Sequence, residues 1–102
     1  MKCKVEILPT AWGDLKFIQD YYCVEFGVKS ALKVNDQILD AIEKLEEYPD
    51  LGSLTPDKWL NEQGYRMIVS GKYVAIYKRI NDTVFIYHIA NTQTEYTKLF
   101  YI

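Results

Sequence analysis

Several residue types and patterns are scarce in this chain, and each scarcity excludes a class of protein. Cys3 and Cys23 are too few for a disulfide framework, and with a single histidine they form no known metal-ligand spacing. The five glycines are scattered, so no glycine-rich phosphate loop follows a strand. The longest uncharged apolar run, Val84 to Ala90, is far shorter than the roughly 20 residues of a membrane span. We therefore expect no metal, no cofactor and no membrane insertion.

The N-terminus and the composition bound the compartment and the number of domains. The first six residues lack the apolar stretch of a signal peptide, which together with the low cysteine content predicts a reduced, cytoplasmic protein. Apolar residues make up 49% and charged residues 25% of the 102 residues, which is typical of one globular domain. We expect a single domain over residues 1–102.

Charge is divided unevenly along the chain, although the formal net charge is only −2. Residues 31–63 hold eight acidic and three basic side chains, whereas residues 64–102 hold two acidic and five basic ones. The middle of the chain is therefore expected to form a solvated acidic surface, and the C-terminal part is the region suited to an anionic partner.

The N-terminal half predicts one strand followed by two helices. Residues 2–8 alternate apolar and polar side chains, as in a half-buried strand. Thr10 is a plausible N-cap for a helix that Gly27 ends, and its apolar stripe consists of Ala11, Leu15, Ile18 and Tyr22. A second amphipathic helix is expected over residues 28–48. Because the connection at Gly27 is short, the two helices should form an antiparallel hairpin.

The C-terminal half predicts three strands, at residues 65–69, 73–78 and 83–89, joined by turns short enough for β-hairpins. The fold class is therefore α+β: an N-terminal strand, a two-helix antiparallel hairpin and a three-stranded antiparallel meander, with the helices on one face of a four-stranded sheet. The other face, concave and partly apolar, is the default site for a partner. Because a buried arginine is unfavourable, we place Arg66 on that uncovered face.

A few residues are candidates for function, each beside a structural interpretation. His88 lies in an apolar run, where a hydrogen-bonded structural imidazole is favoured over a general base. Tyr96 either reaches across the groove or anchors the terminal segment, and the apolar tail, residues 99–102, either docks on its own sheet or is covered by a partner. Four basic residues are either solvated charges or a binding surface: Arg66, Lys72, Lys78 and Arg79.

Six short patterns follow one another over nearly the whole chain. They are Pro9-Thr10-Ala11 with Asp14-Leu15 and Ile18; Phe26-Gly27 before Ala31; Leu45-Glu46-Glu47-Tyr48-Pro49 with Gly52; Gly64-Tyr65-Arg66; Tyr73-Val74-Ala75-Ile76-Tyr77; and Val84 to Ile89 leading to Tyr96. In this order they resemble the RelE/ParE superfamily of toxins from bacterial type II toxin-antitoxin modules. The resemblance implies a toxin, associated with plasmid stabilization and growth inhibition, that a cognate antitoxin holds inactive.

The resemblance also implies two kinds of target. RelE-like members cut messenger RNA on the ribosome without a metal, whereas ParE-like members inhibit DNA gyrase. Arg66 and Tyr96 match a basic and an aromatic position of the ribonucleases, and His88 is a third candidate catalytic residue for proton transfer. Ile68 and Val74 stand where those enzymes have basic residues. The candidate target-binding residues are Lys72, Lys78 and Arg79.

The missing charges decide between the alternatives. Losing one electrostatic contact in a transition state costs about 3 kcal/mol, so a strong nuclease is disfavoured and a ParE-like gyrase inhibitor that works by binding is favoured. The alternatives are a RelE-like, metal-independent mRNA endoribonuclease and a non-toxic module that only binds an antitoxin. The expected partners are a cognate antitoxin and either gyrase or the ribosome with its mRNA. Operator DNA would be bound only through the antitoxin.

Overall fold

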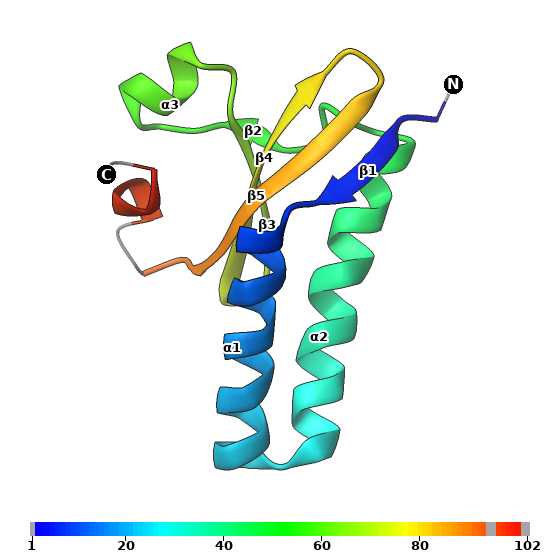
Figure 1. The fold of residues 1–102 in the computed structure, drawn as a ribbon, viewed down its shortest axis with the longest axis vertical. Coiled ribbons are helices and arrows are strands. Elements are labelled where there is room, and N and C mark those ends of the chain that lie inside the picture. The colour runs from blue at the N-terminus through cyan, green and yellow to red at the C-terminus, as the bar shows by residue number, and fades with distance from the viewer. Residues whose placement is uncertain (1, 94–95, 101–102) are drawn as a thin grey trace.

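The computed structural model describes residues 2–93 and 96–100, in which a helical hairpin stands against a five-stranded sheet (Figure 1). The hairpin consists of α1 (Pro9–Phe26) and α2 (Val28–Glu43), and the short helix η1 (Lys44–Glu46) continues α2. The strands are β1 (Lys4–Ile7), β2 (Ser53–Leu54), β3 (Arg66–Ser70), β4 (Tyr73–Ile80) and β5 (Thr83–Asn91). A short helix α3 (Lys58–Glu62) precedes β3, and η2 (Tyr96–Leu99) follows β5.

The strand order in the sheet is β1-β5-β4-β3-β2, with β1 parallel to β5 and the other pairs antiparallel. The predicted α+β class, the helical hairpin and the meander are therefore confirmed. The sheet has five strands and not the expected four, and the parallel pairing of β1 with β5 makes it mixed. The additional strand β2 and the helix α3 lie between the predicted helix over residues 28–48 and the predicted strand over residues 65–69, where neither element was expected. A strand of two residues is too short to show a period, so the sequence pattern carries no signal for β2.

Helix α1 begins two residues earlier than the expected N-cap at Thr10 implies. Pro9 occupies its first turn, where the missing N–H is not needed, and Leu8 precedes it without a side-chain cap. The prediction that Thr10 is the N-cap is wrong, because its hydroxyl donates instead to the Tyr87 carbonyl of β5 at 2.6 Å. The expected helix end at Gly27 is confirmed, with a φ of 95° that favours glycine.

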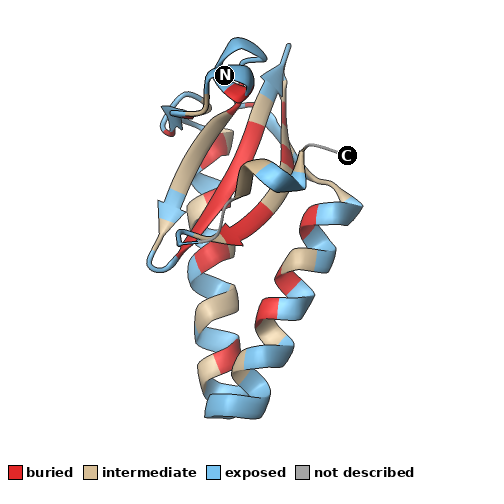
Figure 2. Ribbon diagram, turned by 90° about the vertical axis from the view of Figure 1, so that its left-hand side faces the viewer, coloured by how far each residue is buried: buried red, intermediate tan, exposed pale blue. Residues whose placement is uncertain are grey.

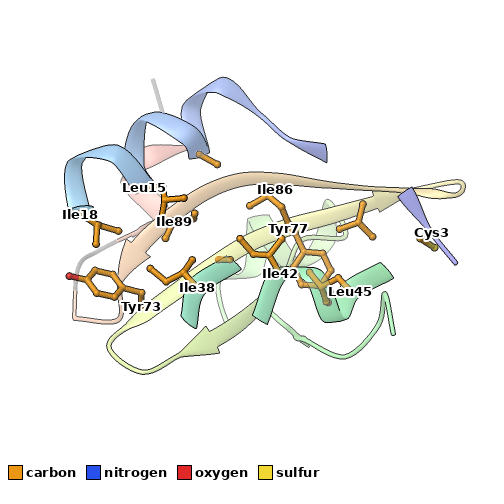
Figure 3. Packing of buried hydrophobic residues seen from close by; sticks show 13 residues of the cluster. Cys3, Leu15, Ile18, Ile38, Ile42, Leu45, Tyr73, Tyr77, Ile86 and Ile89 are labelled. Atoms are coloured by element: carbon orange, nitrogen blue, oxygen red, sulfur yellow. The ribbon is translucent and has the colours of Figure 1, made fainter. Parts of the chain in front are cut away.

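One core fills the space between the hairpin and the sheet (Figure 3). Ile38 and Ile42 of α2 are buried there, as are Leu15 and Ile18 of α1. Tyr77 of β4 is fully buried in the same cluster, although its hydroxyl is polar. That hydroxyl donates to the Pro49 carbonyl and accepts from the Gly52 N–H, both at 2.9 Å, which ties the segment after η1 to the sheet.

A second core covers the opposite face of the sheet, so the expectation that this face is uncovered is wrong. Leu60 of α3 is fully buried there against Val74 and Ile76 of β4, and Tyr96 and Phe100 of the C-terminal segment pack on the same cluster. The signal lies in β4, where five consecutive residues, 73–77, are buried and therefore need cover on both faces. Residues 101–102 of the apolar tail lie outside the described residues.

The hairpin is longer than the part of the sheet that it covers. An α-helix of 18 residues, as in α1, spans about 27 Å. Its end and the start of α2 are exposed, as the tip of the hairpin in Figure 2 shows. The hairpin therefore offers apolar surface beyond its own core. Among residues 2–93 and 96–100, no helix has both the length and the apolar content that crossing a membrane requires.

Candidate partner-binding groove

Arg66 lies on the helix-facing side of the sheet, which corrects the expectation that it lies on the other face. It shares that side of β3 with Ile68, which packs on the first core, and with Ser70, whose hydroxyl donates to the Gln37 carbonyl of α2. The guanidinium avoids the apolar core because Arg66 stands where the segment after η1 offers polar groups. Its Nη1 donates to the Gly52 carbonyl at 2.8 Å.

Tyr96 lies on the other side of the sheet. It packs on the second core, and its hydroxyl lies 3.8 Å from the Sδ atom of Met67. Burial, with a smaller contribution from the charge of Asp57, raises the pKa of the Tyr96 phenol. These contacts agree with the anchoring interpretation. Arg66 and Tyr96 are therefore separated by the sheet and do not face one phosphate position.

His88 lies in the part of β5 that extends beyond its pairing with β1, which ends at Ile86. Its Nδ1 lies 2.9 Å from Oδ2 of Asp14, and the same oxygen accepts the Ile89 N–H at 3.0 Å. The Phe100 ring stands edge-on to the imidazole, with centroids 5.1 Å apart. This geometry suits the structural interpretation, in which Asp14 caps the strand edge and orients the ring. A catalytic role for His88 stays a prediction.

The three candidate target-binding residues lie at three separate places. The ammonium of Lys78 stands 5.2 Å above the Tyr65 ring, next to the second core. Arg79 pairs with Asp50 on the helix-facing side, and Lys72 lies in the turn between β3 and β4. The structure therefore does not gather them on one surface, and their binding roles stay predictions. Within the described ranges, no three His, Cys, Asp or Glu side chains are arranged to hold a metal ion.

What the structure does bring together is a groove beside α1, which we call the hairpin groove. It consists of two adjoining hollows that share Tyr21, Tyr73 and Asn91. One hollow, of about 480 Å³, lies between the two helices and the β3–β4 turn. The other, of about 420 Å³, lies between α1, the end of β5 and Leu99 of η2.

A second apolar stripe on α1 forms one wall of this groove and continues toward the hairpin tip. Phe17 and Tyr21 line the groove, and Val24 extends the same helix face by one turn. The three side chains are 75%, 50% and 84% exposed. They were not predicted from the sequence, because the helical period of α1 was assigned only to the stripe that faces the sheet. Contiguous exposed apolar side chains are typical of a protein interaction site.

The two hollows differ in chemical character. In the first, Tyr21, Tyr22 and Tyr73 form edge-to-face contacts. Lys33 and Lys72 line the same hollow, and none of the described residues around it is acidic. Burial, assisted by Tyr22, raises the pKa of Tyr73 to about 12, so its phenol is neutral at physiological pH. The second hollow is mainly apolar. The groove thus suits a segment with both apolar and acidic side chains.

Comparisons with known proteins agree with this architecture. The family model described as ParE toxin of the type II toxin-antitoxin system parDE matches residues 5–96. A chain of the chromosomal ParDE toxin-antitoxin system from P. aeruginosa superposes with a TM-score of 0.77 at 21% identity, over 90% of this chain and 98% of that one.

A second solved structure has the same fold. A chain of the RelBE2 toxin-antitoxin complex from Mycobacterium tuberculosis superposes with a TM-score of 0.66 at 17% identity, over 89% of this chain and 99% of that one. A search of curated protein sequences finds no relative. Because the family model covers almost the whole domain, the chain belongs to the ParE toxin family of type II toxin-antitoxin systems.

Proposed function

We propose that this ParE-family toxin inhibits growth by binding DNA gyrase, and that its antitoxin neutralises it by occupying the hairpin groove. The observation that carries the antitoxin part is the exposed stripe of Phe17, Tyr21 and Val24 beside a hollow that Lys33 and Lys72 line. In the two related structures the toxin fold occurs within toxin-antitoxin systems.

The chemistry of the groove defines the antitoxin segment that fits it. Burying a side chain such as Phe17 or Val24 contributes about 1.5–3 kcal/mol, so a segment that covers this stripe gains most of its affinity from apolar contact. Carboxylates on the same segment would meet Lys33 and Lys72 at the other hollow. Charge of that sign gives orientation and register more than affinity.

Binding is favoured over RNA cleavage by the positions of the three candidate catalytic residues. A metal-free ribonuclease needs several groups around one phosphate to stabilise its developing charge and to move a proton. Arg66 and Tyr96 lie on opposite faces of the sheet, and Asp14 holds His88 at the sheet edge. This separation supports a toxin that blocks its target by contact.

The antitoxin part is tested with single substitutions of exposed residues. Phe17→Ser should weaken antitoxin binding at least about tenfold, because truncating a hot-spot residue costs about 2 kcal/mol or more, and it should leave the fold intact. Leu51→Ser is the matched control: Leu51 is 53% exposed but lies outside the groove, and its loss should leave affinity unchanged. Unchanged affinity of the Phe17→Ser variant would show that the antitoxin binds elsewhere.

The target is tested with purified gyrase. The free toxin should inhibit DNA supercoiling, and addition of the antitoxin should restore it. Mapping of messenger RNA 5′ ends after induction should show no new cleavage within translated codons. Normal supercoiling at saturating toxin would refute the gyrase assignment, and new codon-specific ends would favour the RelE-like alternative.

A further inference from the structure

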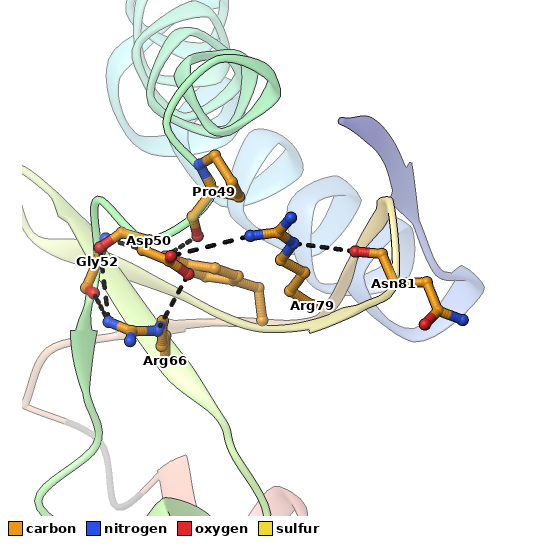
Figure 4. A network of polar contacts seen from close by, with 7 residues as sticks. Pro49, Asp50, Gly52, Arg66, Arg79 and Asn81 are labelled. Carbon is orange, nitrogen blue, oxygen red and sulfur yellow. Dashed lines mark hydrogen bonds and ion pairs between the residues drawn. The ribbon is translucent and has the colours of Figure 1, made fainter. Parts of the chain in front are cut away.

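Two arginines from neighbouring strands converge on a single carboxylate at the helix-facing side of the sheet (Figure 4). Arg66 of β3 pairs in register with Tyr77 of β4, and Arg79 lies two residues further along β4 on the same face. Diagonal neighbours of this kind lie about 7–8 Å apart, within reach of two long side chains. Asp50, in the segment after η1, stands between the guanidinium groups.

Each guanidinium is fixed in position by a backbone carbonyl. Nη1 of Arg66 donates to the Gly52 carbonyl at 2.8 Å, and Nε of Arg79 donates to the Asn81 carbonyl at 2.9 Å. Gly52 is itself held by the Tyr77 hydroxyl. The two cationic groups are therefore oriented by contacts other than the carboxylate between them.

The carboxylate of Asp50 fits this pair loosely. Its Oδ1 lies 3.7 Å from Nε of Arg66 and its Oδ2 lies 3.8 Å from Nη1 of Arg79, so each arginine faces one oxygen. Close charge-assisted hydrogen bonds are about 2.7–2.9 Å long, and arginine prefers to bind an oxyanion through two donors at once. One negative charge also leaves the two positive charges unbalanced.

All three side chains are within reach of solvent. Arg66 is 29%, Arg79 41% and Asp50 64% exposed at the side chain. A ligand can therefore enter, and the Asp50 side chain can rotate away while the contacts of Pro49 and Gly52 with Tyr77 keep the backbone in place. A tetrahedral oxyanion has enough oxygens to accept two hydrogen bonds from each guanidinium, which a planar carboxylate in the position of Asp50 does not achieve.

We propose that Arg66 and Arg79 form a binding site for a phosphate group, which Asp50 occupies as an internal competitor. The phosphate is either free or part of a nucleic-acid backbone. The site is separate from the hairpin groove, because it lies at the opposite end of the core and none of its residues lines that groove.

The test follows the arginine Nε–H resonances of the purified chain by NMR during titration with inorganic phosphate. Asp50→Asn removes the competing charge within 4 Å of both arginines and should tighten phosphate binding by about tenfold or more. Adding Arg79→Gln to that variant should abolish the gain, while circular dichroism shows an unchanged fold. A single-stranded oligonucleotide of ten nucleotides is titrated in parallel. If the oligonucleotide perturbs the same arginine resonances and inorganic phosphate does not, the site is assigned to a nucleic-acid backbone.

Two results would overturn the proposal: no tightening in the Asp50→Asn variant, or equal phosphate affinity with and without Arg79. Either result would leave Asp50 as a structural partner that fixes the segment after η1. The Phe17→Ser variant serves as the control between the two proposals. It should bind phosphate as the unsubstituted chain does, whatever its affinity for the antitoxin.

Discussion

Replacing Tyr77 by phenylalanine removes a single oxygen atom, but that atom holds the segment between η1 and β2 against the sheet. Its hydroxyl accepts from the buried Gly52 N–H and donates to the Pro49 carbonyl. In the variant both groups lose their partner, and the packed ring allows no water to replace the hydroxyl, since Tyr77 has no exposed surface. The change therefore isolates the polar contribution of one core residue.

The expected loss of stability follows from these two contacts. A buried donor left unsatisfied costs about 1–3 kcal/mol, and the second hydrogen bond contributes roughly 1 kcal/mol more. The sum, roughly 2–4 kcal/mol, is a large part of the 5–15 kcal/mol typical of a domain of about this size. With a urea m-value of about 1–3 kcal/mol/M, the unfolding midpoint should fall by roughly 1–2 M.

Urea unfolding followed by circular dichroism measures this loss directly. Tyr48→Phe is the matched control, because Tyr48 is mostly exposed and the same substitution should change stability by less than about 0.5 kcal/mol. A loss below about 1 kcal/mol in the Tyr77→Phe variant would refute the assignment of these hydrogen bonds as the anchor of the segment. Equal losses in both variants would point to the unfolded state instead.

Three further predictions concern stability. Gly52→Ala should destabilise the chain by about 3 kcal/mol or more in urea unfolding, because an added Cβ would lie 2.5 Å from the Met67 carbonyl oxygen. Gly13→Ala is the contrasting variant: the added Cβ meets open space on a helix, and the change should stabilise the chain by roughly 0.5–1 kcal/mol. Leu60→Ala should cost about 2–5 kcal/mol in the same assay if α3 covers the second core, and a loss below 1 kcal/mol would contradict that role. Because the pKa of Tyr73 is raised to about 12 in the folded state, the folded state holds its proton longer than the unfolded state. Stability should therefore decline as pH rises from about 10 to 12, and the decline should be shallower in Tyr73→Phe when unfolding is measured across that range.

The helical hairpin and the meander were predictable because each element carries its own periodic signal. The stripe of Ala11, Leu15 and Ile18 repeats at helical spacing, and all three residues are buried against the sheet. Gly27 ends α1 because its positive φ is favourable for a residue without Cβ. The turns at Gly71 and Asn81 likewise have positive φ, as short β-hairpins require. Local chemistry was sufficient in these places.

The position of Arg66 was not predictable from its strand alone. Alternation placed it on the same side as Ile68 and Ser70, but the period of a strand does not say which side faces the helices. The rule that arginine avoids the core then selected the wrong face. It failed because Arg66 stands beyond the end of α2, where the Gly52 carbonyl and Asp50 provide polar partners.

The amino-acid sequence by itself determined β1, the helical hairpin, the three strands of the meander and their order, because periodicity, glycine turns and strand-forming residues act between near neighbours. Only the tertiary structure decided which side chains meet. It separated Arg66 from Tyr96 by the thickness of the sheet, covered the second face with α3 and η2, and left the Phe17 side of α1 exposed. Such contacts depend on how elements distant in sequence pack together, and no local pattern of residues encodes them.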